Sequence, residues 1–285
     1  MNKTTYHEQR SASGSLIRVA YNEGPAGVWQ AMTSRSKPSP AMEFGTACHT
    51  AFLEPHLFDG QIAVRPEGLD GRTKEGKLWL QSVGDRIVLT QAAAASAHEL
   101  ADRAKAYLEA YYPPLADAEW IVETPIFADV LGHPCRCMPD ILIDSSAFSP
   151  FAWTVVSYKT ARAVDPEAWT RAVVSGMRAG YDIAEALYRR VIAADKGCEP
   201  EDVAILHLVN CTSYPGVRVF EPAPELLARA DEMLPRLLED TSTGLRHVGA
   251  PTFPTSLTFA PPAIVGVPKW ADSAGSAVTE EDENV

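Results

Sequence analysis

The stretch that decides the fold runs from Glu123 to Lys159 and reads ETPIFADVLGHPCRCMPDILIDSSAFSPFAWTVVSYK. A Pro-Asp step at Asp140 opens an apolar segment, Ile141 to Ile143, which is typical of a short buried strand. A polar turn follows, and a second apolar segment then ends in Lys159. The stretch therefore predicts two neighbouring strands, one carrying a carboxylate and the other a lysine.

This pair of residue types suits the metal-dependent hydrolysis of a phosphodiester. A carboxylate holds a divalent cation, and a lysine steadies a hydrolytic water or the negative charge that develops on the phosphate. The same residue types also occur at strand ends as solvated caps, and short motifs match by chance often. The spacing of Asp140 and Lys159 alone leaves both interpretations open.

Length and composition favour one globular domain with a substantial core. The chain has 285 residues, of which 46% are hydrophobic. No apolar run approaches the roughly 20 residues that span a bilayer, and the N-terminus lacks the apolar segment of a signal peptide. We therefore expect a cytoplasmic protein without a membrane partner.

The net charge of −12 argues against general coating of nucleic acid, which requires many phosphate-neutralising lysines and arginines. A local basic channel is compatible with that charge. The densest basic cluster before the central stretch is Arg72, Lys74 and Lys77, which predicts either a solvated loop or a set of DNA phosphate contacts. The five cysteines include the close pair Cys135 and Cys137, but further ligands for a metal site there are lacking.

Helical and strand patterns alternate along the chain without a linker, which predicts one mixed α/β domain over residues 1–272. The clearest helix covers residues 90–112, with Thr90 as its expected N-cap. Residues 1–15 are polar and predict a frayed end. Residues 273–285 form an acidic tail that we expect to be disordered. His49 lies in an apolar helical pattern, where a histidine is either a core residue or a functional one.

Five ordered blocks of sequence carry a resemblance to a known family. They are GTACHTAFLEPHLF (45–58), DGRTKEGKLW (70–79), CRCMPDILID (135–144), SYKTA (157–161) and FPTSLTFAPPAIVGVPKWA (253–271). With these blocks the chain resembles the RecE (exonuclease VIII)-like PD-(D/E)xK nucleases of phages and prophages. The resemblance covers most of the chain. It implies an α/β fold with a restriction-endonuclease-like core, in which helices flank a central mixed sheet.

The resemblance also implies roles for individual residues. Glu123 and Asp140 match metal ligands, and Lys159 matches the catalytic lysine. His49 matches a histidine near the metal site, and Tyr188 matches a tyrosine of the following helix. The implied cofactor is Mg²⁺ or Mn²⁺, bound by hard carboxylate oxygens.

Three positions depart from the family pattern. Ser157 replaces an acid two residues before the lysine, Ala184 replaces a glutamine, and Met138 replaces an arginine. A serine hydroxyl is a poorer ligand for a hard cation than a carboxylate. Three nearby acids are alternatives for the missing charge: Asp144, Asp182 and Glu185. The backbone carbonyl near Tyr158 is a further ligand to consider.

Three functional hypotheses follow. The resemblance implies a magnesium-dependent exonuclease that acts on double-stranded DNA ends in phage-type recombination, in a bacterial or phage-infected cell, as a homo-oligomer and beside a single-strand annealing protein. The departures at Ser157 and Ala184 instead favour a catalytically inactive nuclease fold that binds DNA or a host or phage protein. The acidic net charge also permits an interaction protein with no nucleic-acid role.

Overall fold

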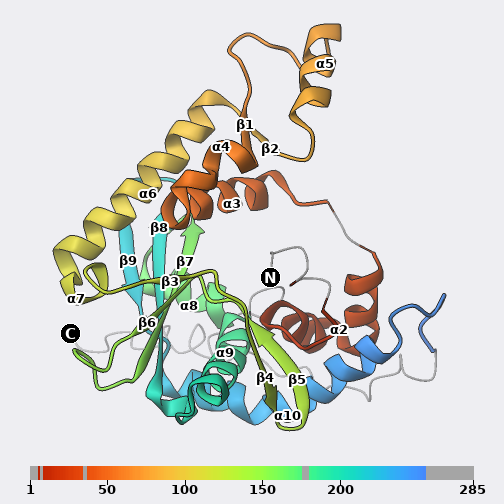
Figure 1. Cartoon of the computed structure of the whole chain (residues 1–285), viewed down its shortest axis with the longest axis vertical. Coiled ribbons are helices and arrows are strands. Elements are labelled where there is room, and N and C mark those ends of the chain that lie inside the picture. The colour runs from red at the N-terminus through yellow and green to blue at the C-terminus, as the bar shows by residue number, and fades with distance from the viewer. Residues whose placement is uncertain (1–5, 7–8, 35–36, 175–179, 255–285) are drawn as a thin grey trace, which may run out of the picture.

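A mixed five-stranded sheet lies at the centre of the protein (Figure 1). The computed structural model describes residues 6, 9–34, 37–174 and 180–254. The strands of the central sheet follow the order β3 (Ile121–Val122), β6 (Ile141–Asp144), β7 (Trp153–Ala161), β8 (Val203–Cys211) and β9 (Val217–Phe220). The pair β7 and β8 is parallel and the other neighbours are antiparallel. The expected α/β fold, a mixed sheet flanked by helices, is confirmed.

The helices that surround this sheet come from every part of the described chain. They are α2 (Gly14–Thr33), α3 (Pro40–Leu53), α6 (Gln91–Tyr111), α7 (Pro113–Ala116), α8 (Pro166–Val174), α9 (Tyr181–Lys196) and α10 (Pro224–Arg246). Two single 3₁₀ turns, η1 (Pro55–Leu57) and η2 (Pro200–Asp202), lie in connections. Thr90 caps α6 as expected, because its hydroxyl accepts a hydrogen bond from the Ala93 N–H at 3.1 Å.

Strand β7 lies inside the sheet, paired with β6 on one side and β8 on the other. Its side chains alternate between two layers of helices, as the pleat of a strand requires. Val156 and Tyr158 pack with α3 and α6, whereas Val155 packs with α2, α9 and α10. Ser157 and Lys159 share the face of Val155, so the pleat directs them towards α9.

A β-hairpin next to the sheet holds the N-terminal segment in place. It consists of β4 (Ile126–Val130) and β5 (His133–Cys137). Ala12 forms a bridge to the hairpin, with its N–H donating to the Pro134 carbonyl at 2.9 Å. The guanidinium of buried Arg136 donates to the Ser11 carbonyl and hydroxyl at 2.6 and 2.8 Å. The expectation of a frayed end is therefore wrong for residues 11–15, because these contacts order them.

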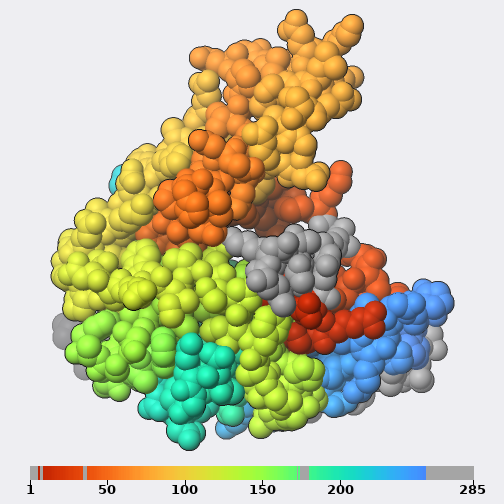
Figure 2. Space-filling model, viewed as in Figure 1, coloured from red at the N-terminus to blue at the C-terminus, as the bar shows by residue number. Residues whose placement is uncertain are grey.

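An arm projects from the body between α3 and α6 (Figures 1 and 2). It contains α4 (Phe58–Gln61), α5 (Lys74–Val83) and a parallel pair of short strands, β1 (Ile62–Val64) and β2 (Ile87–Leu89). Gly76 is required in this arm, because a Cβ atom there would lie 2.0 Å from the Asp70 carbonyl oxygen. The glycine of the RTKEGKLW block thus serves the packing of a loop against a helix.

Several expectations concern segments at the limits of the described chain. The acidic tail 273–285 and nearly all of the closing block 253–271 lie outside the described residues. Within the described part, no helix is long and apolar enough to cross a membrane. Cys135 and Cys137 are buried free thiols, and burial raises the pKa of Cys135 to about 12.

Candidate metal-binding site

Three side chains converge where β6 begins. His49 comes from α3, Glu123 follows β3, and Asp140 precedes β6. One ligand atom from each lies within 4.8 Å of the other two. Two ligands of Mg²⁺ lie at most about 4.2 Å apart, because each is about 2.1 Å from the ion. A small side-chain rotation would therefore let these three groups share one divalent cation.

Lys159 lies against Asp140. Its ammonium group donates to Asp140 Oδ2 at 3.0 Å and to the Tyr158 carbonyl at 3.1 Å. The Tyr158 N–H donates to the same Asp140 oxygen at 2.8 Å. The other carboxylate oxygen, Oδ1, lies 3.8 Å from His49 Nδ1. Asp140 is therefore fixed between a lysine, a backbone amide and an imidazole.

The Asp140–Lys159 pair is charged in the folded protein. Burial alone would raise the pKa of Asp140, but the charges of Lys159 and His49 and two hydrogen bonds outweigh burial and lower it. Burial would likewise lower the pKa of Lys159, yet the neighbouring charge and hydrogen bond of Asp140 raise it. Asp140 is thus negatively charged and Lys159 positively charged across the neutral pH range.

Glu123 reaches the site through an unusual backbone conformation. Its φ angle is 39°, a left-handed value that side chains other than glycine adopt rarely. The Glu123 N–H donates to the Asp140 carbonyl at 3.2 Å, which ties the two ligand-bearing segments together. Such strain is often found at functional sites, where the surrounding structure enforces it.

His49 is placed by aromatic packing rather than by burial in the core. Its ring meets Tyr158 edge to face, with centroids 5.1 Å apart, and Tyr158 stacks on Phe52 at 4.7 Å. Tyr158 is completely buried, and its hydroxyl accepts from the Asn210 amide at 3.3 Å. The aromatic residues of the layer that contains α3 and α6 thus orient His49 towards Asp140.

A cavity of about 200 Å³ opens beside Asp140. Its described lining combines residues of the N-terminal segment, the sheet and α9: Tyr6, Ser13, Gly14, Ser15, Arg18, Met138, Asp140, Ser157, Lys159, Tyr181, Ala184, Glu185 and Tyr188. Six residues to which the sequence assigns a role in the site or a departure from the family pattern therefore meet there, namely Met138, Asp140, Ser157, Lys159, Ala184 and Tyr188.

The alanine at position 184 has a packing reason. A Cβ atom on Gly14 of α2 would lie 3.1 Å from the Ala184 Cβ and 3.0 Å from the Tyr188 ring. The start of α2 therefore approaches α9 closely at this point. A glutamine at position 184 would crowd that approach. The Tyr188 hydroxyl donates to the Met138 carbonyl at 3.4 Å, which links α9 to the segment before Asp140.

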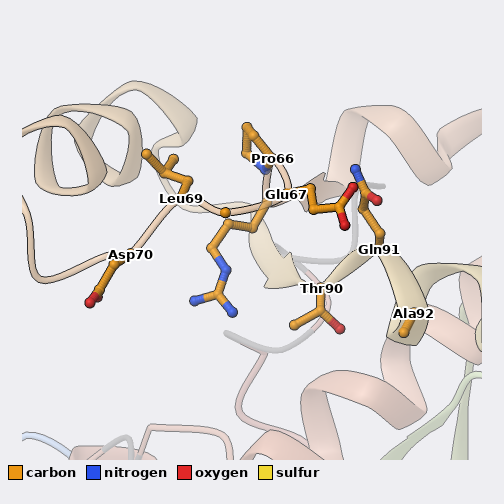
Figure 3. Close-up of a pocket in the computed structure, with 9 residues that line it drawn as sticks. Pro66, Glu67, Leu69, Asp70, Thr90, Gln91 and Ala92 are labelled. Atoms are coloured by element: carbon orange, nitrogen blue, oxygen red, sulfur yellow. The ribbon is translucent and has the colours of Figure 1, made fainter.

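The basic cluster lies apart from this cavity. Arg72, Lys74 and Lys77 are exposed at the start of α5 in the arm, and Arg72 pairs with Asp70 at 2.9 Å. A hollow of about 560 Å³ lies in the same arm, between the loop 65–70 and the residues Thr90 to Ala92 (Figure 3). None of the three metal-ligand candidates lines it. The structure thus does not bring this cluster to the candidate metal site.

The three acids considered as replacements differ in position. Asp144 is exposed at the far end of β6, where it accepts hydrogen bonds from Ser146. Asp182 is buried but is absent from the described cavity lining. Glu185 is both buried and part of that lining. Among these acids, only Glu185 belongs to the same cavity as Asp140.

Two further groups escape inspection of the sequence, one in the cavity lining and one in contact with a lining residue. Arg18 comes from α2, and its guanidinium lies 4.6 Å from the Tyr181 ring centre. His207 comes from β8, where it is the register partner of Ser157, and it contacts Glu185. The sequence around Arg18 carries no motif. His207 lies in a mostly apolar strand pattern, which was the available signal.

Comparison with known proteins supports the fold. No family model matches the chain, and no curated protein sequence matches it. The crystal structure of a "Putative exonuclease" from Eubacterium rectale shares the fold, with a TM-score of 0.51 at 12% identity over 98% of this chain and 99% of that one. The crystal structure of SSO0001 covers 71% of this chain and 85% of its own at 14% identity, with a TM-score of 0.29.

Proposed function

We propose that the protein is a divalent-metal-dependent nuclease that acts on the ends of double-stranded DNA. The observation that carries this proposal is the convergence of His49, Glu123 and Asp140 within 4.8 Å, with Lys159 bonded to Asp140. The shared fold with a protein whose name contains the word exonuclease adds support.

The chemistry divides between the cation and the chain. A bound Mg²⁺ or Mn²⁺ would supply Lewis acidity towards a phosphodiester. Glu123 and Asp140 supply the oxygen ligands that such hard cations prefer, and His49 supplies an imidazole nitrogen. Lys159 holds a proton next to Asp140, where its positive charge stabilises negative charge on a bound phosphate.

The finer role rests on the sequence resemblance. It comprises phage-type recombination, assembly into a homo-oligomer and delivery of a single strand to an annealing protein. The contribution of Arg72, Lys74 and Lys77 to DNA binding also belongs to this proposal. Their exposure on the arm is compatible with contacts to a duplex that extends away from the site.

A second candidate is a nuclease fold that binds DNA or a protein without turnover. The specific observation in its favour is Ser157, whose side chain lines the cavity where the family resemblance implies a carboxylate. The loss of one negative charge weakens a site for a hard cation. The two candidates differ in turnover and share the fold.

The decisive experiment incubates purified protein with end-labelled linear duplex DNA and Mg²⁺ or Mn²⁺. We expect release of nucleotides that is absent with EDTA and absent in Asp140→Ala. A matched control is Asp144→Ala, which removes an exposed acid from the other end of β6 and should retain activity. Binding of DNA with no release under either metal would establish the second candidate instead.

A further inference from the structure

Glu185 enters the cavity from α9, the helix that packs against the β7 face carrying Ser157 and Lys159. The residue is only 4% exposed. One carboxylate oxygen, Oε1, is paired with His207 Nε2. The other oxygen, Oε2, is buried and has no hydrogen-bond partner among the residues that the structure describes. One oxygen of this carboxylate is therefore paired, while the other has no hydrogen-bond partner in the described chain.

The tautomer of His207 follows from its second partner. Trp169 Nε1 lies 3.0 Å from His207 Nδ1. An indole N–H can only donate, so Nδ1 must accept and the imidazole proton of the neutral ring lies on Nε2. His207 therefore donates this proton to Glu185 Oε1. Trp169, His207 and Glu185 form one chain of hydrogen bonds that ends at the cavity.

A buried carboxylate oxygen without a donor costs free energy, since it has lost its hydration. A proton, a trapped water or a cation could satisfy it. Carboxylates that ligate metals are characteristically held by hydrogen bonds from a second group, as Glu185 is held by His207. Glu185 also belongs to the lining of the cavity beside Asp140, although it is not among the three groups that lie within 4.8 Å of one another.

We propose that Glu185 Oε2 ligates a divalent cation at the α9 wall of the cavity, separate from the position defined by His49, Glu123 and Asp140. His207 and Trp169 are positioning residues for this ligand. The inference deepens the proposed function and rests on it, because it supplies a carboxylate to the same cavity that Ser157 lines with only a hydroxyl.

The test is binding of Mn²⁺ to metal-free protein, measured by calorimetry and by the electron paramagnetic resonance of free Mn²⁺. Glu185→Gln keeps the shape of the side chain and removes its charge. We expect it to lose one class of Mn²⁺ site or to weaken that class by about tenfold or more. The matched control is Asp182→Asn, which neutralises an equally buried acid on the same helix outside the described cavity lining and should leave the isotherm unchanged.

Thermal melts in EDTA establish that each variant is folded. If the amide variant does not fold, Glu185→Asp keeps the charge, withdraws the oxygen by one methylene and is expected to weaken the same class. A Glu185→Gln isotherm that superimposes on the native one would overturn the inference. If Asp140→Asn still abolishes Mn²⁺ binding in that case, only this inference fails. If Asp140→Asn has no effect on Mn²⁺ binding either, the proposed metal site of His49, Glu123 and Asp140 fails as well.

Discussion

The two sides of the cavity carry carboxylates that differ in their hydrogen bonding. On the sheet side, Asp140 is fully engaged, because one oxygen accepts from Lys159 and the Tyr158 N–H and the other faces His49. On the α9 side, Glu185 has one oxygen held by His207 and one without a partner in the described chain. A cation at Asp140 Oδ2 therefore competes with Lys159 and the Tyr158 N–H, whereas a cation at Glu185 Oε2 displaces no hydrogen bond of that described part.

This difference separates two properties of the site. The sheet side carries the lysine that can act on a phosphate, so it should govern turnover. The α9 side carries the carboxylate oxygen that has no hydrogen-bond partner in the described chain, so it should govern part of the affinity for metal. Removing groups from each side in turn tests whether the two properties separate in this way.

The largest expected effect is that of Lys159→Met on turnover. Loss of a positive charge aimed at the developing negative charge costs about 10²–10³-fold in rate. Binding of Mn²⁺ should not weaken, because the substitution removes a positive charge that lies 3.0 Å from Asp140 Oδ2. Measured cleavage rates and Mn²⁺ isotherms check both statements. Lys196→Met, at the far end of α9, is the control, and a Lys159→Met enzyme that keeps more than about a tenth of the native rate would contradict the assignment.

Asp140→Asn tests the ion pair through stability. Hydrogen bonds to a charged group contribute about 1.5–3 kcal/mol, so we expect the free energy of unfolding to fall by that amount at neutral pH. The folded-state pKa of Asp140 lies below its ordinary value of 3.8, so the contribution exists above pH 3.8 and is lost as the pH falls through the folded value. The pKa of Lys159 lies above 10.5, so its contribution exists below pH 10.5 and is lost as the pH rises.

Urea unfolding at a series of pH values measures this difference between the native protein and the Asp140→Asn variant. The difference should be constant through the neutral range and should narrow at both extremes. Asp144→Asn provides the control, since that carboxylate is exposed and bonded only to Ser146 among the described residues. An Asp140→Asn variant as stable as the native protein at pH 7 would show that the pair contributes nothing.

The two sides of the cavity also differ in how far the sequence foretells them. Asp140 and Lys159 lie at the ends of adjacent strands, and the period of a strand places Ser157 and Lys159 on one face. The mixed α/β fold follows from the alternation of helical and strand patterns along the sequence. These inferences are local, so sequence patterns carry them.

The α9 side depends on contacts between distant segments. Glu185 and His207 are 22 residues apart, and Trp169 and His207 are 38 apart. No spacing rule joins a helix, a strand and a second helix in this way, so the sequence offers three alternatives for the missing acid and only the packing of α9 on β8 distinguishes them. The ordering of residues 11–15 escaped prediction for the same reason, because the hairpin that binds them begins more than a hundred residues later.

A smaller effect is expected from Trp169→Phe. The substitution keeps an aromatic ring beside His207 but removes the N–H that fixes Nδ1 as an acceptor. The imidazole is then free to adopt the other tautomer, so we expect Mn²⁺ affinity to fall by a factor of about ten or less. The isotherm and the unfolding curve together separate this effect from a loss of packing. An unchanged isotherm would show that Trp169 has no role in positioning Glu185.

The smallest effect is expected from Ser157→Asp. The added carboxylate would face the same cavity as Asp140 and Glu185, because the pleat of β7 directs residue 157 towards α9. If Glu185 already supplies the carboxylate charge to this cavity, a third carboxylate adds repulsion as well as ligation, and the Mg²⁺-dependent cleavage rate should change by no more than about threefold. A large gain in rate would mean that the missing acid at position 157 limits the native protein, and that Glu185 does not replace it. The double variant Ser157→Asp, Glu185→Gln separates these cases, since cleavage restored in that background would place the functional carboxylate on β7 rather than on α9.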